Sequence, residues 1–162
     1  MKKRQRSVLE SFENNAVERV LALDSADLLV LRGHGVLEAA LFSLLAARLA
    51  IESDELPTLN FETLARLSLS GTPFNSLLGA ALQLNKLRNL VAHEIEPADV
   101  ETRMLEFAAL VLSSLGSEFQ AKPTALDAFR AALMVMMYTL MRLSVGVIEV
   151  RHSATPVEVE RD

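Results

Sequence analysis

The sequence predicts an all-α protein, a compact bundle of about five to six helices that forms one domain over residues 1–162. Hydrophobic residues make up 51% of the chain and aromatic residues only 5%, and a Leu/Ala-rich composition of this kind favours packed helices over sheets. Apolar residues also recur at helical spacing along most of the chain. Residues that cap helices stand at several of the expected helix starts. A chain of this length can bury a sizeable core.

Composition also narrows the function classes. The chain has no cysteine, which excludes a disulfide framework and a cysteine metal site and fits a reducing compartment such as the cytoplasm. A net charge of −5 argues against a broad basic surface for nucleic acid but leaves a small local basic site open. The basic start MKKRQR is followed by no apolar signal core. It is either a solvated tail or a phosphate-contacting arm, and residues 1–7 and 151–162 are expected to be flexible tails.

The first half of the chain predicts three helices. Residues 8–23 carry apolar side chains at helical spacing. Asp24 or Ser25 can cap a longer helix that runs to about Ile51. After the polar linker IESDELPTLN, Asn60 can cap a short helix that ends near Ser68.

The second half predicts three more helices. Thr72 followed by Pro73 is a favourable N-cap and first helical residue, so a helix is expected from Pro73 to about Ala92. Another runs from Pro97 to about Leu115, where Gly116 can end it. Thr124 can cap the last helix, residues 125–150.

The last helix is unusually apolar. AALMVMMYTLM carries no charge, and LSVGVI follows Arg142. A membrane span needs about 20 predominantly apolar residues, and Arg142 interrupts this stretch. We therefore expect a helix buried on several sides, in the core and at a subunit interface, and no membrane association.

The stretch LNKLRNLVAHE, residues 84–94, concentrates polar side chains on one helix. Asn85, Asn89 and His93 follow one another at intervals of four and form a stripe, with Arg88 beside it. The opposite, core-facing side is apolar. It consists of Leu77, Ala80, Leu84, Leu87, Leu90 and Val91.

Apolar residues also stand among the polar ones on the stripe side. They are Leu78, Ala81, Leu82 and Ala92. An ordinary solvent-facing side would carry more Lys and Glu. We therefore expect this side to be covered as well, by a second subunit.

These side chains suit a phosphate ligand. The planar fork of Arg88 matches phosphate oxygens, Asn89 can hold a hydroxyl or phosphate oxygen, and His93 can exchange a proton near neutral pH. Together they could cleave RNA without a metal. The alternative is a helix end in which His93 interacts with the helix dipole and Arg88 pairs with a surface carboxylate.

A second polar cluster, Arg32, His34 and Glu38, lies on the expected second helix. His34 and Glu38 are spaced to hydrogen-bond. Gly33 and Gly35 are costly in a helix, so they indicate either a kink or the close approach of another backbone or a ligand. If this helix lines the same cleft, Arg32 and His34 extend the phosphate site and Glu38 orients His34. The histidines lack the spacing of a zinc-protease motif, so no metal is expected.

RNLVAH resembles the R-x4-6-H motif of the HEPN superfamily, in the form in which Asn follows Arg. The context is most similar to the mannitol operon repressor-like group: RGHGVLEAALFSLL, then NFETLARLSL, then LNKLRNLVAHE. The resemblance covers roughly residues 20–115. It implies a helical bundle, usually a homodimer, in which two motif helices build one cleft from two Arg/His sets.

The resemblance implies two function classes. Many members are metal-independent endoribonucleases of toxin–antitoxin, defence or RNA-processing systems, and the motif makes Arg88, Asn89 and His93 the catalytic residues. Asn85, Arg32, His34 and Glu38 would then bind substrate, with no cofactor. Other members bind nucleotides or proteins without catalysis, and the repressor-like group is named for transcription regulation. RNA, a nucleotide or an operon-encoded protein are the partners that the resemblance implies. Some toxins carry a tyrosine two residues after the histidine as a modification site, and here that position is Ile95.

Overall fold

The computed structural model describes residues 17–52, 55–93, 99–117 and 124–153. Most of these residues are helical, and no strand occurs among them. The described residues 17–21 are helical and come before five further helices. These are α2 (Ala26–Leu49), α3 (Phe61–Leu69), α4 (Leu77–His93), α5 (Val100–Ser114) and α6 (Ala125–Ser153). The predicted all-α bundle is confirmed. The MKKRQR segment, the start of the first helix, Pro97 and the tail from residue 154 lie outside the described residues.

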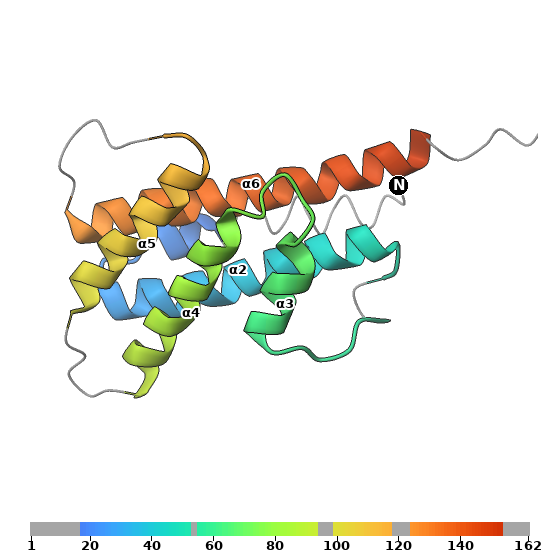
Figure 1. Cartoon of the computed structure of the whole chain (residues 1–162). Helices are drawn as coiled ribbons and strands as arrows, with labels where there is room; N and C mark the ends of the chain where they lie inside the picture. Colours follow the sequence, from blue (N-terminus) through green and yellow to red (C-terminus); the bar gives the residue numbers. More distant parts are fainter. Residues whose placement is uncertain (1–16, 53–54, 94–98, 118–123, 154–162) are drawn as a thin grey trace, which may run out of the picture.

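Helix α2 is the centre of the bundle. It packs along α6 and also contacts α3 and α4, while α5 lies against α4 and α6 (Figure 1). Gly33 permits the close approach of α6, because an added Cβ would collide with the side chain of Leu133. Gly35 has no such neighbour within 4 Å. At Gly33 the close neighbour is thus a side chain of α6 rather than the backbone or ligand that was expected.

The apolar faces of all these helices meet in one core. Phe107 of α5 packs on Phe129 of α6 with ring centroids 5.0 Å apart. Both rings are fully buried, and Leu37 and Leu41 of α2 are buried with them. Burial of such side chains is the main favourable term in folding.

Several predicted helix boundaries are confirmed by their hydrogen bonds. The side chain of Asn60 accepts from the backbone N–H of Thr63 at 2.9 Å, and Ser25 accepts from Leu28. Gly116 has a φ of 68°. The N–H of Ser117 bonds to the carbonyl of Leu112, which closes α5 with a left-handed glycine cap.

The start of α4 differs from the prediction. The helix begins at Leu77 rather than Pro73. The Thr72 hydroxyl donates to the carbonyl of Leu69 and accepts from the N–H of Phe74, and the residues that follow are linked by bonds between residues three apart. The chain is thus wound into successive turns before the helix begins. At the other end of the chain, α6 continues to Ser153, so residues 151–153 of the expected flexible tail are helical.

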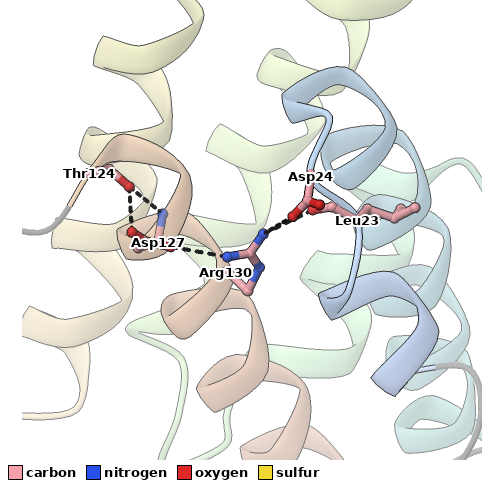
Figure 2. A network of polar contacts seen from close by, with 5 residues as sticks. All are labelled: Leu23, Asp24, Thr124, Asp127 and Arg130. Atoms are coloured by element: carbon pink, nitrogen blue, oxygen red, sulfur yellow. Dashed lines mark hydrogen bonds and ion pairs between the residues drawn. The ribbon is translucent and has the colours of Figure 1, made fainter.

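A polar network joins α6 to the segment before α2 (Figure 2). Thr124 caps α6 as predicted, accepting from the N–H of Asp127 and donating to its carboxylate at 2.6 Å. Arg130 donates to Asp127 at 3.0 Å and to the carbonyl of Leu23 at 2.9 Å, and it lies 3.7 Å from the carboxylate of Asp24. Arg130 therefore satisfies a carbonyl beyond the end of the 17–21 helix.

Two helices are long and apolar enough to cross a membrane by length and composition alone, α2 and the Ala125–Val147 part of α6. In each, half of the most apolar window is buried inside the fold. The core helices of soluble proteins share these properties. Within α6, Met136 and Met137 are buried, whereas Met134 and Tyr138 are exposed.

Candidate functional site

His34 lies near the middle of α2 at the junction with α3 and α4. Only 8% of the residue is exposed. Its Nε2 lies 3.1 Å from Oδ1 of Asn85 on α4. Its ring packs on the ring of Phe61, the first residue of α3, with centroids 4.1 Å apart and planes inclined by 31°. The imidazole thus contacts one side chain from α3 and one from α4.

The contact with Asn85 defines which nitrogen of the ring carries the proton. An amide oxygen only accepts hydrogen bonds, so Nε2 of His34 carries the hydrogen and donates it. Burial lowers the pKa of His34 below its usual 6.5, and the positive charge of Arg88 acts in the same direction. The bond to Asn85 and the negative charge of Glu38 oppose this shift. The ring is therefore neutral at pH 7, and its Nδ1 is an unprotonated acceptor.

Glu38 stands one turn after His34 on α2. The expected hydrogen bond between them is absent, although both residues are described, because Nε2 of His34 is directed to Asn85 on α4. Glu38 acts on His34 through its charge alone. The expectation that Glu38 orients the ring by a hydrogen bond is wrong, and Asn85 does so instead.

Arg88 and Asn89 form the next part of the stripe. Nη1 of Arg88 donates to Oδ1 of Asn89 at 3.0 Å. Arg88 is half-buried and Asn89 is exposed. Because the charge of Arg88 lowers the pKa of His34, the guanidinium lies within electrostatic reach of that ring. His34, Asn85 and Arg88 therefore belong to one polar cluster.

His93 is the last residue of α4 and is exposed. It stands eight residues after Asn85, which corresponds to about 12 Å along a helix axis. A five-residue separation places it about 140° around the helix from Arg88. Within one chain, His93 and His34 therefore lie at opposite ends of the stripe, with Arg88 and Asn89 between them.

Arg32 does not join this cluster. It precedes His34 by two residues, which is about 200° around the helix, so it leaves α2 on the opposite side. Arg32 is exposed there, as are its neighbours Leu28 and Leu31. Arg32 lies outside this cluster, and its role in substrate binding stays a prediction.

The stripe side of α4 is covered partly by the chain itself. Ala81, expected among the polar residues, is fully buried, and Leu78 packs against the core. Asn85 is covered by His34 of α2. Ala92 and His93 are exposed. The first part of this side is thus covered within the chain, with α2 contacting it at Asn85, and Ala92 and His93 at the end of α4 are exposed.

Phe61 was not anticipated as part of the site. Its capped position at the start of α3 could be predicted from Asn60. Its contact with His34 depends on how α3 packs on α2, which local sequence does not specify. In the part of the chain that the structure describes, no three His, Asp or Glu side chains gather in a way that could hold a metal ion.

Comparisons of the chain with protein-family models, with curated proteins and with solved structures found no match. The residues of the α2–α4 cluster and the motif at the end of α4 are therefore the features that bear on function.

Proposed function

We propose that this chain is a HEPN-like endoribonuclease that acts without a metal, as a homodimer, with Arg88, Asn89 and His93 as its catalytic residues. The observation that carries the proposal is the position of these residues. α4 is buried through Leu77, Ala80, Ala81, Leu84 and Leu87. Its polar residues from Arg88 onward lie at the less buried end of the helix, where a ligand can reach them.

The chemistry needs one base, one acid and a positive charge. His93 takes the proton of a ribose 2′-hydroxyl, the 2′-oxygen bonds to the adjacent phosphorus, and the bond to the 5′-oxygen breaks. A second histidine returns a proton to that leaving oxygen. Arg88 stabilises the added negative charge on the phosphate, and Asn89 holds an oxygen in place. The products are a 2′,3′-cyclic phosphate and a 5′-hydroxyl.

A dimer supplies the second histidine. Arg88 and His93 diverge by about 140° on one helix, so each can contact one ligand only from a different side. Two α4 ends facing each other place two Arg/His sets around one RNA. The proposal locates the protein in the cytoplasm, with α2 and α6 as core helices.

A second candidate is a non-catalytic HEPN-like regulator that binds a nucleotide or an operon-encoded protein. One observation favours it. His34 and Asn85, both expected to bind substrate, bond to each other instead. A net charge of −5 also disfavours a long RNA contact.

The two candidates are separated by a cleavage assay with mixed RNA in EDTA. The wild type is compared with Arg88→Ala and His93→Ala, and with Lys86→Ala as a matched control. Lys86 is an exposed cation of the same helix outside the proposed machinery. We expect the wild type and the Lys86 variant to leave cyclic phosphate ends and the other two variants to leave RNA intact. Failure of the wild type to cut, or equal cutting by all four, contradicts the enzyme.

The mass of the protein in solution gives an independent check. A composite cleft requires two copies, so the enzyme proposal expects a dimer at assay concentration. A strict monomer contradicts the proposed cleft and favours the regulator.

A further inference from the structure

Helix α4 is linked to α2 by a side-chain contact unlike those that link α3 to α2. Arg48 of α2 donates to the carbonyls of Leu67 and Ser68, and the Ser68 hydroxyl donates to the carbonyl of Leu41. The link from α2 to α4 runs instead through the imidazole of His34 to Asn85. Imidazole is the side chain whose charge changes between pH 5 and 8.

We propose that His34 is a pH-sensitive latch, whose neutral ring holds α4 against α2 and whose second proton loosens the motif-bearing end of α4. The proposal goes beyond RNA cleavage. It concerns the packing of α4 and holds whether the protein cuts RNA or only binds a partner.

The surroundings of the ring determine what the second proton does. From α2, Glu38 favours a cation on the ring, and from α4, Arg88 opposes it. From α3, the contacting residue is Phe61, which does not titrate but whose face attracts a cation. Burial lowers the pKa of His34 by more than the bond to Asn85 and the charge of Glu38 raise it. An imidazolium is therefore stabilised when the junction opens and water reaches it.

The bond to Asn85 is compatible with either charge state, because Nε2 carries a hydrogen in both. The new proton is added at Nδ1, on the part of the ring that does not bond to Asn85. The latch thus opens through the cost of a buried charge rather than through loss of a hydrogen bond.

The direction of the pH dependence follows from the lowered pKa of His34. In the open or unfolded chain the ring titrates near pH 6.5. Above that pH the ring is neutral in both states and the latch is at full strength. As pH falls below 6.5, the open state binds a proton that the closed state does not. The open fraction then rises by at most about tenfold per pH unit, and the rise ends at the folded pKa.

Hydrogen exchange measured by mass spectrometry tests the latch. Peptides from α4 are followed between pH 7.5 and 5.5, with exchange corrected for the intrinsic pH dependence of each amide, and peptides from α5 are the internal reference. We expect α4 to lose protection relative to α5 below pH 6.5, by up to about tenfold per unit. Constant relative protection of α4 over this range overturns the proposal.

Two variants separate His34 from other titrating groups. His34→Gln keeps an N–H donor toward Asn85 but carries no charge, and it should abolish the pH dependence of α4. His93→Gln removes an exposed histidine of α4 and should leave the pH dependence of α4 unchanged. A pH dependence that persists in His34→Gln, or disappears in His93→Gln, overturns the assignment.

The wild type alone provides a final test that does not depend on the folding of any variant. The ring signals of its three histidines are followed by NMR, and those of His34 are assigned through the contact of its ring with the ring of Phe61. We expect His34 to titrate below 6.5. A midpoint at or above 6.5 for His34 overturns the latch.

Discussion

Replacing Gly33 and Gly35 by alanine, one at a time, tests the packing of α2 on α6. Both glycines lie in the interior of the same helix and neither has a positive φ. Alanine is more favourable than glycine in a helix interior by about 1 kcal/mol. At Gly35, an added Cβ meets nothing within 4 Å. Gly35→Ala should therefore stabilise the protein by about 0.5–1 kcal/mol.

Gly33→Ala adds a second, opposing contribution. Its Cβ would collide with the end of the fully buried Leu133 side chain, which would have to shift within the core. Overpacking of this kind costs about 1–3 kcal/mol. Since the helix preference is the same at both positions, it cancels in the comparison. Gly33→Ala should be less stable than Gly35→Ala by about 1–3 kcal/mol.

The assay is urea unfolding followed by circular dichroism of the helices, which suits a chain with no tryptophan. In a Leu133→Ala background the obstacle is absent, so Gly33→Ala should there become as favourable as Gly35→Ala. Equal stability of the two single variants would refute the close packing of α2 and α6 at Gly33.

Two further predictions concern arginines that cap chain segments, measured by the same unfolding assay. Arg48→Met removes donors to two carbonyls in the last turn of α3, at 2.6 and 2.7 Å, and should destabilise the protein by about 1–3 kcal/mol, with Arg48→Lys intermediate. Arg130→Met removes the bond to the carbonyl of Leu23 and should cost about 1–3 kcal/mol. The control is Arg66→Met, which breaks an exposed pair with Glu62 and should cost below about 0.5 kcal/mol. If Arg48→Met or Arg130→Met costs no more than this control, the hydrogen bonds of that arginine contribute no net stability.

The features that could be predicted from the sequence are those encoded within a few neighbouring residues. Ser25, Asn60 and Thr124 cap helices because a side-chain oxygen two or three bonds from Cα can reach an N–H three residues on. Gly116 ends α5 because glycine adopts positive φ readily. The start of α4 was misplaced because Thr72 bonds to Leu69 in the preceding helix and to Phe74, forming turns.

The candidate site could be predicted only in part. Helical spacing correctly grouped Asn85, Asn89 and His93 on α4 and placed Arg88 beside them. It could not show that His34 would bond to Asn85, since their contact joins residues 51 apart in sequence. The sequence predicts a second subunit over this side, which stays a prediction, and the structure shows that Asn85 itself bonds to His34 of α2. An apolar surface predicts that something packs on it and does not specify which element does so.

The pairing of α2 with α6 has a consequence for synthesis of the chain. Leu133, which packs on Gly33, is added 100 residues later. At ribosomal rates of about 5–20 residues per second, the nascent chain carries the α6-facing side of α2 without its partner for roughly 5–20 s. During this interval a bundle of α2–α5 would leave that apolar side open to solvent. The growing chain therefore exposes an apolar helix face until α6 emerges and completes the core.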